Sequence, residues 1–402
     1  MNFVFISPQF PHTYWNFCDR LRRNGVNVLG IGDSPYEELE DHLKEVITEY
    51  YKVSTLEDYD QVYRAVAYFA FKHGRIDWLE SNNEYWLEQD ARLRTDFHIT
   101  TGADVTEVAC FKSKSGMKEY YAKANVPTAR CRSVTTLEDA ESFLEEVGYP
   151  VIVKPDCGVG AAHTAKLENA EDLRRFFSAL PENPYVIEEF IEGDIVSYDA
   201  IIDSCCNPLF ESMTVWPPSI MDIVNQGLDL SYYTADTVPE TLSELGRATV
   251  KAFNARSRFV HLEFFRLTNP RKGLGDIGDF VGLEVNMRPA GGYTPDMMNY
   301  AHSTDVYQIW ADMVTCDKRI LPESEKHHFC VYASRRDTHQ YRYTHEEILA
   351  RYGERIVMCE RMPEIMSGAM GNQMYTAHAA DETAVREFIA FVHKRANEGE
   401  QT

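Results

Sequence analysis

Residues 282–292, GLEVNMRPAGG, have the most informative pattern in the sequence. Glu284, Asn286 and Arg288 occupy every second position of the central part of this stretch, and apolar side chains alternate with them. Because alternation is the period of a β-strand, the three polar side chains are predicted to share one face. The carboxylate and the carboxamide offer oxygen ligands to a hard cation, and the guanidinium pairs with an anion. We therefore expect this strand to face a metal-bound polyphosphate.

A second carboxylate lies on the strand predicted just before it. Residues 259–267, FVHLEFFRL, have a strand pattern, and a loop rich in Gly and Asp separates them from the strand 280–288. If the two strands are antiparallel neighbours, Glu263 lies beside Glu284. With Asn286 they form an oxygen set that suits Mg²⁺, with Mn²⁺ as the alternative metal. The other interpretation is a pair of surface strands with ion pairs, although carboxylates flanked by apolar residues are uncommon there.

Further upstream, a lysine lies at the end of an apolar strand. Residues 149–155, YPVIVKP, end in Lys154-Pro155, and the small-residue turn CGVGAAH follows with Gly158 and Gly160. In such a turn, backbone N–H groups approach a phosphate closely while the lysine neutralises its charge. The alternative is an exposed lysine at a strand end. Cys157 is interpreted as a small loop filler, because no nearby pattern supplies the base that a nucleophile needs.

Two other segments give weaker signals. Lys112 is a second phosphate candidate, but two more lysines follow within six residues and any of the three could be solvated. The segment VIEEFIEGD, residues 186–194, is either an acidic turn or a hinge strand whose backbone groups contact an adenine edge. In the second case, Asp194 or Glu192 would contact a ribose hydroxyl.

Composition limits the classes of partner. The chain has 402 residues with 44% apolar and 26% charged content, which is enough for two or three globular domains. Its net charge of -23 argues against a nucleic-acid partner and an anionic membrane surface. The nine cysteines have no CxxC spacing and are expected to be reduced. Neither a signal peptide nor a membrane span is recognisable, so we expect a cytoplasmic protein.

The N-terminal part has the rhythm of a parallel α/β sheet. Strand patterns alternate with amphipathic helix patterns at 2–7, 14–25, 26–32, 56–74 and 76–81. This order predicts parallel strands joined by crossover helices. No GxGxxG follows the first strand, so dinucleotide binding is not supported.

The order of these pieces resembles the ATP-grasp superfamily, over about residues 1–320 and most strongly from 109 to 295. The closest branch is that of the carboxylate–amine ligases, such as dipeptide and carnosine-type synthases. The resemblance implies an α/β fold with an α+β grasp. Its expected parts are a pre-grasp domain at 1–108, a grasp domain at 109–320 with a mobile lid at about 125–190, and an α+β region at 321–402.

The resemblance also implies roles for individual residues. Each role concerns ATP, Mg²⁺ or a small substrate: Lys112, Lys154, Gly158 and Gly160 at the phosphates; Glu188, Glu189, Ile191 and Asp194 around the nucleoside; Glu263, Glu284 and Asn286 at the metal; Arg288 at the transferred phosphoryl group; Glu84, Gly291 and Gly292 at the substrate. Two departures from the family are the two alanines in the loop after Lys154 and Ile195, which stands where an acidic ribose ligand is common.

The expected reaction is therefore ADP-forming ligation of a carboxylate to an amine, by way of an acyl-phosphate. A bicarbonate-using, carboxylase-like enzyme and an ATP-binding sensor without activity are the alternatives. Specificity is expected from residues 204–245 and from the loop after Gly292. The resemblance also allows a homodimer.

Overall fold

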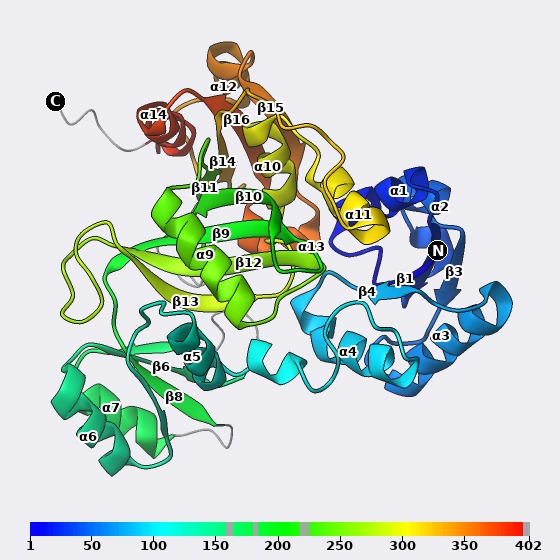
Figure 1. Cartoon of the computed structure of the whole chain (residues 1–402). Helices are drawn as coiled ribbons and strands as arrows, with labels where there is room; N and C mark the ends of the chain where they lie inside the picture. The colour runs from blue at the N-terminus through cyan, green and yellow to red at the C-terminus, as the bar shows by residue number, and fades with distance from the viewer. Residues whose placement is uncertain (158–163, 180–183, 218–222, 224–225, 397–402) are drawn as a thin grey trace.

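A computed structural model describes residues 1–157, 164–179, 184–217, 223 and 226–396 of the chain. They form three sheets, which lie in different parts of the molecule in Figure 1. The N-terminal sheet is parallel, in the order β3-β2-β1-β4, as predicted. Its elements are β1 Asn2–Ile6, α1 Trp15–Arg23, β2 Asn27–Gly32, α2 Asp41–Val46, β3 Glu49–Lys52, α3 Tyr59–His73, β4 Trp78–Glu80 and α4 Leu87–Asp96.

The second sheet is small and antiparallel, with the order β5-β8-β6-β7. Two helices cover it, and their apolar side chains pack on Val151, Val153 and Ile187. This small lobe lies at the lower left of Figure 1. Its elements are β5 Cys131–Val134, α6 Leu137–Val147, β6 Val151–Pro155, β7 Ala165–Leu167, α7 Ala170–Ser178 and β8 Tyr185–Glu189.

The third sheet has eight strands in the order β13-β12-β9-β10-β11-β14-β16-β15. The pairing of β11 with β14 makes the C-terminal strands part of it. Its strands are β9 Gly193–Ile202, β10 Pro208–Val215, β11 Ser231–Thr234, β12 Arg258–Leu267, β13 Phe280–Asn286, β14 Phe329–Arg335, β15 Ile356–Arg361 and β16 Gln373–Ala379. The helices are α5 Lys114–Lys123, α9 Glu240–Ala252, α10 Thr294–His302, α11 Val306–Cys316, α12 His345–Tyr352, α13 Glu364–Met370 and α14 Glu382–His393.

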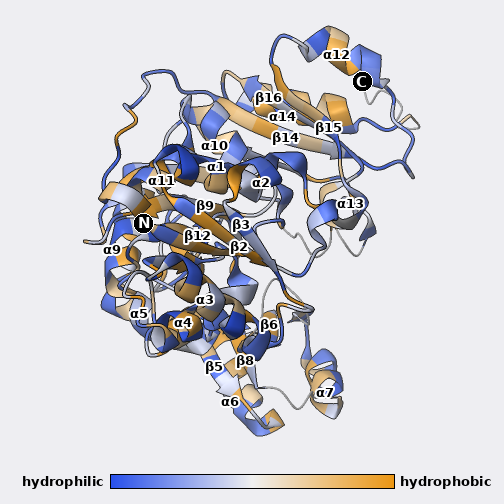
Figure 2. Cartoon of the chain, turned by 90° about the vertical axis from the view of Figure 1, so that its right-hand side faces the viewer, coloured by the Kyte–Doolittle hydropathy of each residue, from blue (hydrophilic) through white to orange (hydrophobic). Residues whose placement is uncertain are grey.

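Apolar packing joins the N-terminal sheet to the large sheet. The strands β9 and β12 are coloured as hydrophobic in Figure 2, and α11 lies between this sheet and α1. Trp310 of α11 is buried, with its ring 4.9 Å from that of Phe17 and 5.7 Å from that of Phe3. Trp78 of β4 belongs to the same apolar cluster as Phe259 of β12, so this packing brings β4 against the large sheet.

A buried ion network makes a second connection at that point. The carboxylate of Glu80, at the end of β4, lies 3.4 Å from Arg94 of α4 and 3.3 Å from Arg258 of β12. Arg258 also donates to the carbonyl of Met287 at 3.2 Å. All three charged side chains are at most 4% exposed, so removal of one would leave a buried charge without its partner.

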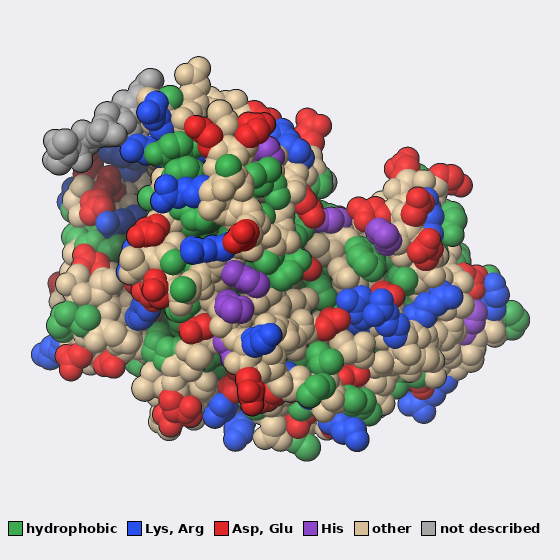
Figure 3. Space-filling model, turned by 90° about the horizontal axis from the view of Figure 1, so that it is seen from above, with side chains coloured by type: hydrophobic (Ala, Val, Ile, Leu, Met, Phe, Trp, Pro, Cys, Tyr) green, Lys and Arg blue, Asp and Glu red, His purple; other side chains and the backbone are tan. Residues whose placement is uncertain are grey.

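The surface shows no concentration of positive charge on the face drawn in Figure 3, where acidic and basic side chains are interspersed. Among the described residues, no helix is both long enough and apolar enough to cross a membrane.

Candidate active site

Six polar side chains form two rows on one face of the large sheet. The strands β9, β12 and β13 are adjacent and antiparallel, and residues that pair directly point to the same side. The first row is Ser197, Glu263 and Glu284, and the second is Asp199, His261 and Asn286. The predicted pairing of Glu263 with Glu284 is therefore present. Both carboxylates keep about a quarter of their side chain exposed, at 26% and 24%, and remain accessible to a ligand.

A β-bulge interrupts the ladder at these carboxylates. Glu263 pairs with Glu284, but Phe264 pairs with Gly282, so Leu283 is the extra residue. Bulges re-aim side chains and are common beside active sites. Gly282 is required here, because a Cβ at this position would lie 2.8 Å from the ring of Tyr121 on α5.

His261 connects the two rows. Its Nδ1 lies 2.7 Å from the Asp199 carboxylate, and its Nε2 lies 3.2 Å from Glu263. Burial opposes protonation of His261, but the two carboxylates outweigh burial and raise its pKa to about 9. Burial raises the pKa of Glu263, but its hydrogen bond and charge interaction with His261 outweigh this and lower it. Burial, followed by the charge of Glu263, raises the pKa of Glu284.

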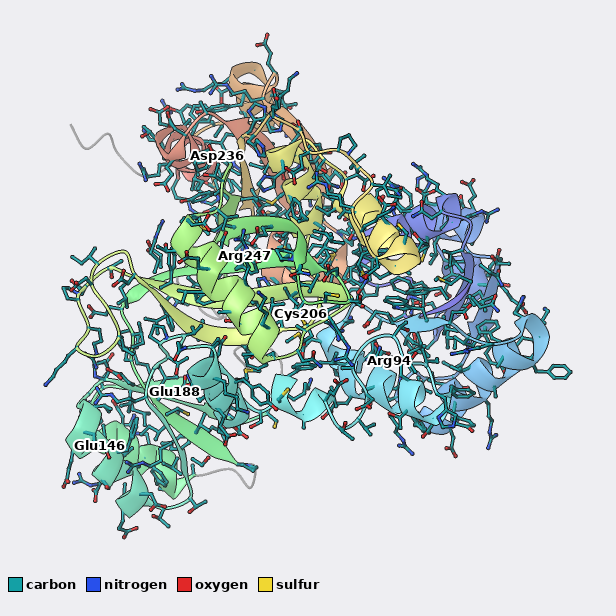
Figure 4. The ribbon with its side chains drawn as sticks, in the orientation of Figure 1. Arg94, Glu146, Glu188, Cys206, Asp236 and Arg247 are labelled. Carbon is teal, nitrogen blue, oxygen red and sulfur yellow. The ribbon has the colours of Figure 1, made fainter. Side chains whose placement is uncertain are left out.

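A second buried ion cluster faces the rows from the small lobe. Glu188 of β8 pairs with Lys154 of β6 at 2.5 Å and with Lys118 of α5 at 2.9 Å. Burial by itself raises the pKa of Glu188, but the charges of the two lysines outweigh burial and lower it to about 2. Glu188 is labelled in Figure 4 on the small-lobe side of β13. Lys154, predicted at the phosphates, thus lies at the site with a carboxylate as its counter-ion.

The lysines at the start of α5 separate into two groups. Lys114, the first residue of the helix, is buried and lies 3.6 Å from Glu284. Lys112 precedes the helix and points elsewhere, donating to the carbonyl of Glu84 at 3.1 Å and lying 3.7 Å from its carboxylate. Asp156, two residues after Lys154, accepts hydrogen bonds from Ser113 and from the backbone N–H of Ser115, which fixes the start of α5 against β6.

Arg288 lies two residues beyond the end of β13. Its guanidinium donates to the carbonyl of Pro289 at 2.8 Å and forms no ion pair with a described residue. Its charge, after the larger contribution of His261, lowers the pKa of Glu263. Glu84, predicted on the substrate side, is buried and accepts from the N–H of Met287 at 3.3 Å, immediately before Arg288.

The predicted glycines differ in their surroundings. Gly291 is exposed, and nothing occupies the space that a Cβ would take. Gly292 has φ +63°, and a Cβ there would lie 2.8 Å from Met370 of α13. The positive φ favours glycine at this position, whereas the Met370 methyl group is the end of a flexible side chain and can shift. Gly158 and Gly160 lie outside the described residues.

Three residues predicted around the nucleoside have other partners. Glu189 points away from Glu188 and pairs with Arg130 at 2.7 Å and Arg271 at 2.5 Å. The Ile191 side chain is buried among apolar neighbours, so only its backbone is free to contact an adenine. Asp194 pairs with Arg266 at 3.0 Å, and the alternation of β12 puts both on the sheet face opposite Glu263.

The oxygen donors fit a hard divalent cation. Glu263, Glu284 and Asn286 project from neighbouring positions of one sheet face, and Mg²⁺ accepts few protein ligands because it keeps water and phosphate oxygens. Within the described ranges, no three or more His, Cys, Asp or Glu side chains form a complete metal site by themselves. The lysines and Arg288 supply the positive charge that a polyphosphate needs.

Comparison with known proteins supports the fold. Residues 112–212 match the ATP-grasp (A) domain of phosphoribosylglycinamide synthetase. The L-amino acid ligase from Bacillus licheniformis superimposes with a TM-score of 0.70 at 14% identity, over 97% of both chains. The N5-carboxyaminoimidazole synthetase from Staphylococcus aureus complexed with ADP has a TM-score of 0.69 at 15% identity, over 96% of this chain and 95% of the other. Phosphoribosylglycinamide synthetase from Anaerococcus prevotii has a TM-score of 0.67 at 13% identity, over 97% of both chains.

Proposed function

Because this chain is an ATP-grasp protein, we propose that it is an ADP-forming ligase that joins a small carboxylate to an amine, with Mg²⁺ as its metal. The observation that carries the proposal is the direct pairing of Glu263 with Glu284 opposite the buried lysines 114 and 154. The similarity to a solved L-amino acid ligase over 97% of the chain supports an amino acid as one of the substrates.

The proposed reaction has two steps, phosphoryl transfer and amide formation. The carboxylate attacks the terminal phosphorus of ATP, the bond to the bridging oxygen breaks, and ADP leaves. An uncharged amine then attacks the acyl carbon, a C–N bond forms as the C–O bond to phosphate breaks, and the proton that the amine loses passes to the leaving phosphate. The products are an amide, ADP and phosphate.

The protein contributes position and charge to this reaction. Glu263, Glu284 and Asn286 would hold Mg²⁺, which when bound neutralises phosphate charge. Lys114 and Lys154 would bind phosphate oxygens, with Glu188 as the counter-ion in the resting protein. Arg288 would stabilise the charge on the phosphoryl group during transfer. His261, held between Asp199 and Glu263, would fix the orientation of the Glu263 carboxylate.

The experiment that tests this proposal is incubation with Mg²⁺, ATP, pooled carboxylic acids and pooled amino acids. ADP release and product masses are then measured together. We expect a new mass equal to acid plus amine minus water. Glu284→Gln and Arg288→Ala should retain the fold and lose at least about 100-fold in turnover, whereas Glu146→Gln, on an exposed surface of the small lobe, should match the unmodified protein.

Other outcomes would assign a different function. ADP release that needs bicarbonate and no amine would indicate the carboxylase-like alternative. ATP binding without turnover in any pool would indicate a sensor. Near-normal turnover of Glu284→Gln would refute the role of the paired carboxylates.

A further inference from the structure

A cavity of about 520 Å³ lies between the N-terminal domain and the end of β6. The N-terminal domain contributes Glu57, Tyr85, Trp86 and Glu88 to its wall, and Lys112 closes one side. Gln89 and Cys157 also line the cavity, and Cys157 follows β6 by two residues. The volume is that of a small-molecule site, large enough for an amino acid.

The charge available to a ligand in this cavity is negative. Lys112, the only Lys or Arg among the described lining residues, is already engaged by Glu84, at 3.1 Å from its carbonyl and 3.7 Å from its carboxylate. Glu57 accepts from the hydroxyl of Tyr85 at 2.5 Å, and neither Glu57 nor Glu88 has an ion pair within the described part of the chain. Two carboxylates without a counter-charge favour a cationic ligand.

A neutral donor and an aromatic wall complement these carboxylates. The side-chain nitrogen of Gln89 is buried and has no hydrogen-bond partner among the described residues, although it lines the cavity. A buried donor of this kind needs an acceptor, which a ligand carbonyl or carboxylate provides. The rings of Tyr85 and Trp86 meet edge to face at 4.7 Å and offer π faces to a cation.

The cavity adjoins the candidate active site. Lys112, in its wall, contacts Glu84, and the Glu84 carboxylate accepts from the N–H of Met287, next to Arg288. Burial, followed by the charges of Asp156 and Glu88, raises the pKa of the Cys157 thiol. A ligand in the cavity is therefore held between the start of the loop after Lys154 and the phosphoryl-transfer side of β13.

We propose that this cavity binds the amine substrate, and that this substrate carries a second, cationic group in addition to the amine that reacts. A basic amino acid has this chemistry, with its carboxylate as the acceptor for Gln89, whereas a diamine offers only the two nitrogen groups. Glu57 and Glu88 hold the distal cation of the ligand. Gln89 donates to the ligand's carboxylate or carbonyl, and the reacting amine points towards Arg288. The proposal rests on the proposed ligase function.

The test compares matched cationic and neutral amines: lysine with norleucine, arginine with citrulline, and cadaverine with pentylamine. We expect the cationic member of at least one pair to have a kcat/KM about tenfold or more above that of its neutral partner, since one charge-assisted contact is worth about that factor. Glu88→Gln and Glu57→Gln should each raise KM for the cationic amine about tenfold and leave the neutral amine unchanged. Glu45→Gln, an exposed carboxylate change on α2, is the matched control.

Hydroxylamine separates this inference from the ligase function, because it traps an activated carboxylate without the natural amine. Hydroxamate formation that is equal in all variants, together with no preference for cationic amines, would overturn the amine site alone. Absence of both hydroxamate and ADP would overturn the ligase function. In that case, titration calorimetry with lysine and cadaverine still tests the cavity, and equal heats for the unmodified protein and Glu88→Gln would overturn the inference.

Discussion

Glu188→Gln gives a quantitative test of the lysine cluster. The change removes the charge that balances Lys154 and Lys118 and leaves two ammonium groups facing each other in a buried site. The two lysines lower the pKa of Glu188 from its ordinary value of 4.5 to about 2, which corresponds to about 3 kcal/mol. Because Glu188 is only 6% exposed, solvent screens little of this energy. For 402 residues, the loss corresponds to a fall in Tm of about 4 °C.

The second part of this prediction concerns ATP. Without Glu188, the two lysines lose their ion-pair partner and gain more from the phosphates, so Mg-ATP should raise the Tm of the variant by more than it raises that of the unmodified protein. Scanning calorimetry with and without Mg-ATP measures both effects. Glu146→Gln is the matched control, since Glu146 pairs with Arg132 on the exposed surface of the same lobe, where ion pairs contribute little. An unchanged Tm, or equal ATP effects in the two proteins, would show that Glu188 does not balance the two lysines.

Three further predictions follow from particular residues. Lys114→Met should raise KM for ATP at least about tenfold, whereas Lys112→Met should leave it within about twofold, because only Lys114 lies at Glu284; steady-state kinetics with varied ATP would show the reverse order if the assignment is wrong. Burial raises the pKa of Asp296 to about 7, so the folded state holds this proton more tightly and the unfolding free energy should fall between about pH 4 and pH 7; urea unfolding at several pH values should show a smaller fall for Asp296→Asn. Mn²⁺ binding measured by electron paramagnetic resonance should weaken by at least about tenfold in Glu284→Gln, and an unchanged affinity would contradict the metal assignment.

The central part of the site could be predicted because its signals are local. Alternation in 282–292 and one short loop determine which face Glu284 occupies and which residue it pairs with. The parallel N-terminal sheet was likewise predictable from its strand–helix rhythm, except for β3 and α2, which are too short to show a period.

Other features of the site could not be predicted, because they depend on contacts between distant segments or on the exact residue at which a helix begins. His261 was missed because Asp199, its partner, comes from β9, although the His-x-Glu spacing of His261 and Glu263 is a signal that could have identified it. The choice between Lys112 and Lys114 depends on where α5 begins, and that position is fixed by Asp156 from another strand. The C-terminal strands join the large sheet through β11 and β14, which are almost one hundred residues apart.

The proposed mechanism depends on transfer of a phosphoryl group to a carboxylate. The acid substrate can be labelled with ¹⁸O in its carboxylate, and the label followed by mass spectrometry of the products. We expect one labelled oxygen in inorganic phosphate, with ADP as the nucleotide product. Label in AMP would show that the carboxylate attacks the α-phosphorus, and the acyl-phosphate mechanism would then be wrong.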